Sequence, residues 1–100
     1  MELTYCISLS KKASSDLNDL RKSGKGKKAE EILTRLAEDP FSIRYEKLKG
    51  EYDGLFSIRI NAADRLVYEI EESDDPRYAG VINVHRMRTH CKGIIPLILL

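Results

Sequence analysis

The sequence predicts an α+β domain in which one strand and a helical hairpin precede a twisted antiparallel sheet of about four strands. Three observations predict it. Apolar residues recur every second position in residues 2–9, every third or fourth position between residues 10 and 39, and every second position again after Pro40. One hundred residues suffice for one domain, and 42% apolar with 33% charged residues exclude a disordered tail or a membrane protein.

The first predicted strand, residues 2–9, is half-buried because apolar and polar residues alternate in it. Its apolar face carries Leu3, Tyr5, Ile7 and Leu9. Ser10 follows in the position of an N-cap and begins a helix that runs to about Lys22. The apolar stripe of that helix is Ala13, Leu17 and Leu20.

A second helix is predicted to begin near Lys27, after the interruption Ser23-Gly24-Lys25-Gly26. Its apolar stripe is Ala29, Ile32, Leu33, Leu36 and Ala37. Asp39-Pro40 ends it, because a residue before proline is disfavoured in the helical region. The short turn between the two helices predicts an antiparallel helical hairpin.

Residues 55–60 and 65–70 are predicted strands joined by the turn Asn61-Ala62-Ala63-Asp64. Pairing Ile60 opposite Leu66 puts six apolar residues on one face, toward the helices, namely Phe56, Ile58, Ile60, Leu66, Tyr68 and Ile70. The opposite, outer face then carries Ser57, Arg59, Arg65, Val67 and Glu69. This register therefore presents two arginines on the outer face of the sheet.

Two further strands complete the predicted order β-α-α-β-β-β-β. A short strand lies within residues 46–49, before a turn over residues 50–54. The last strand, residues 78–87, has irregular alternation: Ile82 and Val84 share one face, whereas Val81 and Met87 share the other. Its faces are left unassigned.

Charge and cysteine content exclude several functional classes. Seventeen Lys and Arg against sixteen Asp and Glu exclude a strongly basic nucleic-acid arm, so any RNA binding must come from local clustering. The two cysteines, Cys6 and Cys91, form no zinc motif, and we expect reduced thiols in a cytoplasmic protein. We also expect no signal peptide and no membrane span, because the apolar segment at residues 94–100 is far shorter than the roughly 20 residues required.

Several segments together resemble the Txe/YoeB branch of the RelE/ParE superfamily, the toxins of bacterial toxin–antitoxin modules. They are Glu46-Lys47-Leu48-Lys49, residues 54–60, residues 64–68 and Arg88-Thr89-His90. The resemblance extends in register over residues 1–91, which it identifies as a RelE-like toxin domain, and leaves residues 92–100 as an apolar extension. It implies an endoribonuclease without metal or cofactor that cleaves mRNA on the translating ribosome and is neutralised by a cognate antitoxin.

The resemblance also implies roles for individual residues. Glu46 matches the general base, Arg65 the phosphate-binding arginine and His90 the general acid. The implied substrate-binding positions are Lys49, Arg59, Arg88 and Cys91. This branch typically has tyrosine after the histidine, so Cys91 removes an aromatic ring from the implied site.

These three residue types suit metal-free cleavage that uses the ribose 2′-OH as nucleophile. A carboxylate can remove the 2′-OH proton, and a histidine with an ordinary pKa of about 6.5 can protonate the leaving 5′-oxygen. The planar fork of arginine matches two phosphate oxygens and can stabilise the transition state.

Each feature also has a simpler interpretation. Glu46 alone would be a solvated strand edge, Arg59 and Arg65 could form surface ion pairs with Glu69, and His85 and His90 could be structural. The cations of residues 21–28 are either a solvated turn or a contact with ribosomal RNA phosphates. They are Arg21, Lys22, Lys25, Lys27 and Lys28.

Other functions and roles therefore remain open. The alternative function is a non-catalytic module that binds antitoxin, ribosome or RNA, and a further one is an unrelated α+β RNA-binding protein. Residues 92–100 either cover the domain's own core or contact a second copy or the antitoxin, which leaves a homodimer open.

Overall fold

The structure, a computed structural model, describes residues 3–87, and residues 1–2 and 88–100 lie outside the description. Its elements are β1 (Thr4–Leu9), α1 (Lys11–Lys22), α2 (Gly26–Glu38), β2 (Glu46–Lys47), the 3₁₀ turn η1 (Gly50–Tyr52), β3 (Phe56–Arg59), β4 (Arg65–Glu71) and β5 (Tyr78–Arg86). The predicted order of helices and strands is confirmed.

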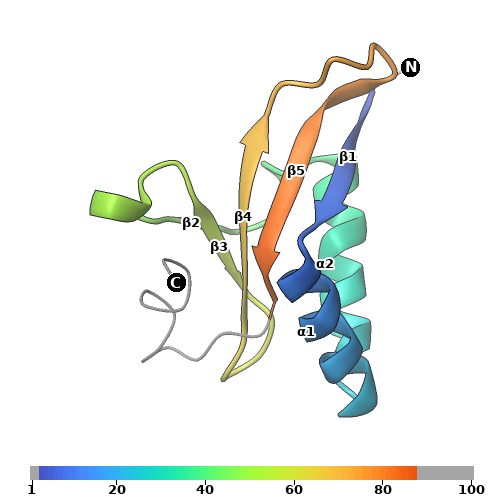
Figure 1. Cartoon of the computed structure of the whole chain (residues 1–100), viewed down its shortest axis with the longest axis vertical. Helices are drawn as coiled ribbons and strands as arrows, with labels where there is room; N and C mark the ends of the chain where they lie inside the picture. The colour runs from blue at the N-terminus through green and yellow to red at the C-terminus, as the bar shows by residue number, and fades with distance from the viewer. Residues whose placement is uncertain (1–2, 88–100) are drawn as a thin grey trace.

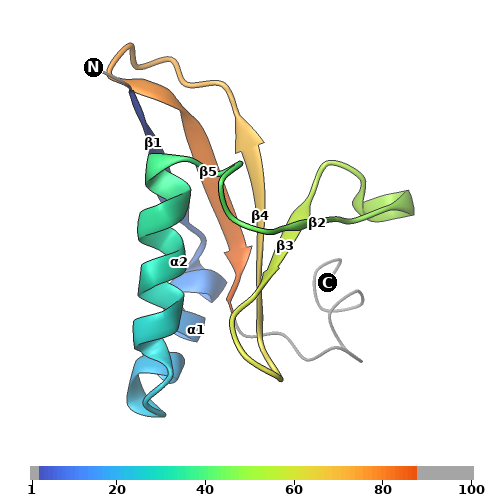
Figure 2. The ribbon, with the colours of Figure 1, turned by 180° about the vertical axis from the view of Figure 1, so that it is seen from behind.

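The strands form one five-stranded sheet in the order β1-β5-β4-β3-β2, and the helical hairpin packs on one of its faces (Figures 1 and 2). β1 pairs with β5 in parallel, whereas the other neighbours are antiparallel. The predicted α+β fold is confirmed, with the difference that the sheet has five strands rather than about four and one of its pairs is parallel. The first strand joins the sheet as well, because one of its edges pairs with β5 from Thr4 to Leu9.

The predicted cap of α1 is confirmed and also attaches the helix to the sheet. The hydroxyl of Ser10 accepts a hydrogen bond from the Ala13 amide at 3.0 Å and donates one to the His85 carbonyl at 2.9 Å. At the other end of the hairpin, a β-carbon added to Gly26 would lie 2.6 Å from the Arg21 Cγ. Glycine therefore allows the two helices to approach closely where α2 begins.

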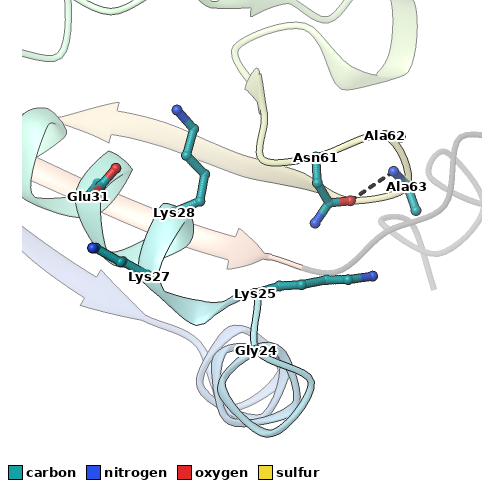
Figure 3. Close-up of a pocket in the computed structure, with 8 residues that line it drawn as sticks. All are labelled: Gly24, Lys25, Lys27, Lys28, Glu31, Asn61, Ala62 and Ala63. Atoms are coloured by element: carbon teal, nitrogen blue, oxygen red, sulfur yellow. Dashed lines mark hydrogen bonds between the residues drawn. The ribbon is translucent and has the colours of Figure 1, made fainter.

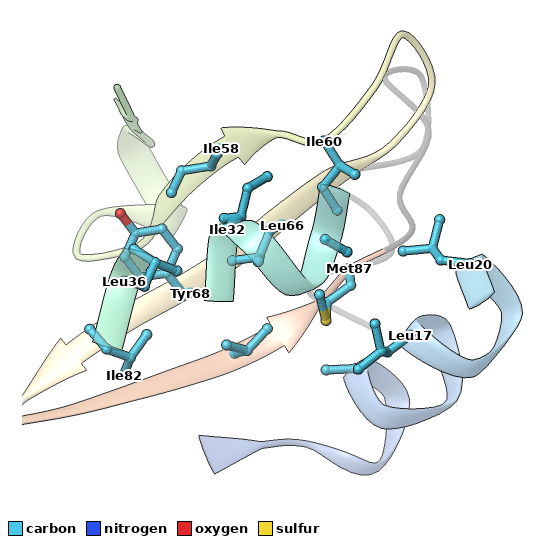
Figure 4. Close-up of a cluster of buried hydrophobic side chains, with 13 residues drawn as sticks. Leu17, Leu20, Ile32, Leu36, Ile58, Ile60, Leu66, Tyr68, Ile82 and Met87 are labelled. Atoms are coloured by element: carbon cyan, nitrogen blue, oxygen red, sulfur yellow. The ribbon is translucent and has the colours of Figure 1, made fainter. Parts of the chain in front are cut away.

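The core lies between the hairpin and the inner face of the sheet (Figure 4). Its buried members are Ala13, Leu17, Leu20, Ala29, Ile32, Leu36, Ile58, Ile60, Leu66, Tyr68, Ile82, Val84 and Met87. The predicted inner face is thus confirmed for β3 and β4, together with both helical stripes. Leu33 and Ala37 of the second stripe are only partly buried.

The predicted register of β3 and β4 is wrong by two residues, since Leu66 lies opposite Ile58 and not opposite Ile60. The turn explains the shift, because the amides of Ile60 and Asn61 both donate to the Asp64 carbonyl. A shift of two residues preserves the side-chain parity, so every residue keeps its predicted face.

The faces of β5, which the sequence leaves open, follow from the pairing. Gly80, Ile82 and Val84 are buried toward the helices. Met87 joins the same core despite its odd position, because regular strand geometry ends at Arg86. This end effect accounts for the irregular alternation.

Candidate active site

Three neighbouring strands bring Glu46, Ser57 and Arg65 together on the outer face of the sheet. Glu46 of β2 lies opposite Ser57 of β3, and β3 in turn pairs with β4, which begins at Arg65. The Nη1 atom of Arg65 donates to the Glu46 Oε1 at 3.2 Å and to the Ser57 Oγ at 3.0 Å. The predicted base and the predicted phosphate-binding arginine are therefore in contact.

The members of this cluster differ in accessibility. Ser57 is 2% exposed, and the side chain of Arg65 is 18% exposed, whereas the side chain of Glu46 is 66% exposed. A buried hydroxyl thus orients a half-buried guanidinium, and the carboxylate beside it remains open to solvent. The ion pair of Arg65 is made with Glu46 rather than with the expected Glu69, whose Oε1 lies 3.0 Å from His85 Nε2.

Arg59 stands directly opposite Arg65 in the β3–β4 pair. Like charges at directly opposed positions destabilise a sheet, and the ion pair between Glu46 and Arg65 offsets part of this repulsion. An anionic ligand at this position would relieve the repulsion between the two guanidiniums further.

A groove of about 460 Å³ adjoins the cluster at the β2–β3 edge of the sheet. It is lined by Lys28, Ile32 and Arg35 of α2, residues 43–46, residues 57–59 and Arg65. Five of the lining side chains are cationic, namely Lys28, Arg35, Arg44, Arg59 and Arg65, against the single carboxylate of Glu46. We refer to this cavity as the cationic groove.

Four of its cations, all except Arg65, form no ion pair with any other residue in the range 3–87. The charge of the cationic groove is therefore largely uncompensated within the described fold, and it favours binding of an anionic strand. The sequence prediction missed Arg35 and Arg44. The spacing of Lys28, Ile32 and Arg35 along one helical face is the signal that could have found the first.

A second hollow, of about 660 Å³, lies between the hairpin tip and the β3–β4 turn (Figure 3). Its lining includes Lys25, Lys27 and Lys28 from the predicted basic segment and residues 61–63 from the turn. Asn61 shapes that turn, since its Oδ1 accepts from the amides of Ala63 at 2.8 Å and Asp64 at 3.0 Å. Lys28 lines both hollows, so the basic segment adjoins the cationic groove.

The remaining predicted residues do not join either hollow. Arg21 is paired with Glu30 at 2.7 Å, and Lys22 and Lys49 are exposed but line neither cavity. Arg88, His90 and Cys91, together with residues 92–100, lie outside the described residues. Within residues 3–87 no group of His, Cys, Asp and Glu is arranged to hold a metal ion. In the same range no helix combines the length and apolarity needed to cross a membrane.

Comparison with models of protein families and with curated proteins gives no match. Solved structures do match. YoeB from Staphylococcus aureus, in complex with YefM, is 26% identical, with a TM-score of 0.65 over 86% of this chain and 97% of that chain. The YoeB/ParE toxin from Agrobacterium tumefaciens is 22% identical, with a TM-score of 0.73 over 85% of this chain and 98% of that chain. YafQ from E. coli is 16% identical, with a TM-score of 0.68 over 88% of this chain and 96% of that chain.

The chain has the fold of these RelE/ParE superfamily toxins. The resemblance inferred from the sequence is thereby confirmed, and the YoeB structures among the neighbours support its assignment to the Txe/YoeB branch. In this chain, the Glu46–Arg65 contact and the cationic groove occupy the same edge of the sheet. The predicted boundary at residue 91 lies outside the described residues.

Proposed function

We propose that this protein is a toxin of a type II toxin–antitoxin system that cleaves mRNA on the translating ribosome without a metal or cofactor. The observation that carries the proposal is the solvent-accessible carboxylate of Glu46, 3.2 Å from the Arg65 guanidinium and beside the cationic groove. A carboxylate and a guanidinium in contact can serve proton abstraction and phosphate binding at one phosphodiester.

In the proposed reaction, Glu46 takes the proton from a ribose 2′-OH, and the 2′-oxygen attacks the adjacent phosphorus. Arg65 donates to the non-bridging oxygens as negative charge grows on them. The bond from phosphorus to the 5′-oxygen then breaks, and His90 gives its proton to that oxygen. The products are a 2′,3′-cyclic phosphate and a 5′-hydroxyl. The role of His90 rests on the family resemblance.

The other predicted residues would act in binding. The cations of the groove would hold phosphates on either side of the scissile bond, with Arg59 directly opposite Arg65. Lys49, Arg88 and Cys91 are proposed as further substrate contacts on the resemblance alone. Lys25, Lys27 and Lys28 line the second hollow and suit contact with ribosomal RNA phosphates, which Arg21 and Lys22 would extend.

The proposed partners are a cognate antitoxin, the ribosome and mRNA, in the cytoplasm. Solved neighbours include the S. aureus YoeB–YefM complex, the E. coli DinJ–YafQ complex and a YoeB dimer from S. aureus. These support an antitoxin complex and make a homodimer a further proposal.

Cleavage in a translating extract tests the proposal. We expect the wild type to cut mRNA there and to leave naked RNA largely intact. Alanine at Glu46, Arg65 or His90 should lower the cleavage rate by about 10²–10⁴-fold while the thermal unfolding transition remains cooperative. Arg77→Ala is the matched control, since Arg77 is exposed in the β4–β5 connection and paired with Asp75.

The alternative function is a non-catalytic binding module, and Cys91 is the observation that favours it. Intact transcripts in the presence of ribosome-bound wild type would establish this alternative. A large gain of cleavage in Cys91→Tyr would show that the missing ring limits activity, whereas unchanged cleavage would show that the cysteine is tolerated.

A further inference from the structure

A row of four aromatic rings leads from the core to the surface at the β2–β3 edge. Phe41 and Tyr45 have ring centroids 6.5 Å apart at 69°, Tyr45 and Phe56 5.4 Å apart at 88°, and Phe56 and Tyr68 5.5 Å apart at 32°. Tyr68 is 1% exposed, whereas Phe41 is 60% exposed. The row therefore ends on a large apolar ring in solvent.

Tyr45 is the member of this row that lines the cationic groove. It is half-buried, and it lies in the chain between Arg44 and Glu46, which line the same groove. Both neighbouring rings meet it at steep angles, so neither is stacked parallel on it. Neither of these two contacts therefore provides the parallel stacking that a nucleic-acid base could add from the groove.

The position of Tyr45 is held from the core. Tyr45 packs against the buried core cluster, and Phe56 links its ring to that of the buried Tyr68. A ring anchored in this way loses little conformational entropy when it binds a ligand. The contacts to Phe41 and Phe56 restrict it further.

A cation-lined groove with an aromatic side chain is the combination by which proteins bind single-stranded nucleic acid. Phosphates contact the cations, and unpaired bases stack on the ring. We propose that Tyr45, with Phe41 beside it, forms a stacking site for one unpaired RNA base adjacent to Glu46. The inference rests on the proposed function and adds a binding residue that comes from this chain's own sequence, at a position the sequence analysis did not select.

Binding of a short single-stranded RNA to the full chain tests the stacking site. The probe is a fluorescently labelled oligoribonucleotide with 2′-O-methyl groups throughout, which cannot be cleaved through the 2′-oxygen, measured by anisotropy at low salt. A second probe lacks one base at a defined position. We expect Tyr45→Leu to bind the intact probe about 10-fold more weakly and Tyr45→Phe to bind it as the wild type does.

Tyr5→Leu is the matched control, since Tyr5 is also half-buried against the core but lies on β1, at the opposite edge of the sheet. It should leave RNA affinity unchanged. The abasic position is moved along the probe. At one position, removal of the base should lower the affinity of the wild type but should not lower the already weaker affinity of Tyr45→Leu any further. Thermal unfolding of each variant ensures that binding is compared between folded proteins.

Equal affinities of wild type and Tyr45→Leu for the intact probe would overturn the stacking site. So would an equal loss in Tyr5→Leu. The proposed function fails by a different readout, namely absence of mRNA cleavage in the extract. Loss of RNA binding in Tyr45→Leu without any cleavage by the wild type would keep the stacking site and reject the nuclease.

Discussion

At the scale of single residues, Arg65 contributes both its positive charge and the hydrogen bonds that fix its orientation in the site. One guanidinium nitrogen contacts both the exposed carboxylate of Glu46 and the buried hydroxyl of Ser57. The arginine is thereby aimed along the outer face of the sheet before any substrate binds. Such preorganisation suits the stabilisation of charge that develops only in a transition state.

Arg65→Lys should therefore reduce cleavage by at least about 10-fold, because an ammonium lacks the planar fork that matches two phosphate oxygens. The measurement is the cleavage rate in a translating extract at fixed ribosome concentration. Arg77→Lys is the control, an exposed arginine paired with Asp75, and should cleave as the wild type does. Full activity in Arg65→Lys would mean that positive charge alone is required at this position.

The family resemblance selected Glu46 and Arg65 as candidate site residues, and the structure places them in contact, but the sequence did not predict the whole groove around them. Strand alternation places Arg59 and Arg65 on one face whatever the exact register, since a slip of two residues preserves parity. Helical spacing could have placed Arg35 on the same face as Lys28, but its convergence with Arg44 depends on how α2 lies against residues 43–46, which no local pattern encodes.

At the scale of elements, α1 is joined to the end of β5 by a nearly buried ion pair. Asp16 accepts hydrogen bonds from the Arg86 Nε at 2.9 Å and from the Met87 amide at 3.0 Å. The side chains of Asp16 and Arg86 are 11% and 14% exposed. The pair holds the end of the strand just before the segment that carries Arg88 and His90.

Asp16→Ala should lower the free energy of unfolding by about 3–5 kcal/mol, because it leaves a mostly buried Arg86 without this carboxylate and the Met87 amide without its acceptor. Urea unfolding followed by circular dichroism measures the change. Asn18→Ala, an exposed change on the same helix, should stay within about 0.5 kcal/mol of the wild type. Equal stability of the two variants would contradict the structural role assigned to Asp16.

The helices and strands themselves were easier to predict than the long-range contacts between them. The caps, the hairpin and the apolar stripes depend on neighbouring residues, and Ser10, Gly26 and Pro40 mark them directly. Asp16 lies within the apolar stripe of α1, which was a signal that it is buried. Its partner is 70 residues away in the chain, so helical periodicity could not name it.

At the scale of the whole molecule, a net charge of +1 conceals a separation of charge. Cations gather in the groove and at the hairpin tip, whereas Glu71, Glu72, Asp74 and Asp75 lie at the end of β4 and in the β4–β5 connection. A neutral sum is therefore compatible with a surface that attracts RNA on one side.

Replacing Arg35 and Arg44 together by glutamine should flatten the salt dependence of RNA binding. For single-stranded RNA, the slope of log affinity against log salt decreases by about 0.7 for each phosphate that the protein no longer neutralises. Titration of the uncleavable RNA probe at several potassium chloride concentrations gives this slope. The control is a double variant at sites outside the groove, Lys12→Gln with Arg77→Gln, which should retain the wild-type slope. A wild-type slope in the Arg35→Gln/Arg44→Gln variant would show that these two arginines do not contact RNA phosphates.

The arrangement of the sheet as a whole was the least predictable feature. Alternation identifies β1 as a strand but does not say where it pairs, and its parallel partner β5 begins only at Tyr78. The sheet therefore has five mixed strands where about four antiparallel ones were expected.

The position of β5 has a consequence for synthesis of the protein. Among the described residues, the strand translated last is β5, which lies between β1 and β4, so β1 has no neighbour in the sheet until β5 has been made. Glu46, Ser57 and Arg65 are all translated earlier, but β4, which carries Arg65, has one edge unpaired and its apolar face incompletely covered until then. Nascent or truncated chains that end before Tyr78 thus lack a central strand and cannot complete this sheet. The five-stranded sheet can therefore assemble only after β5 has been translated.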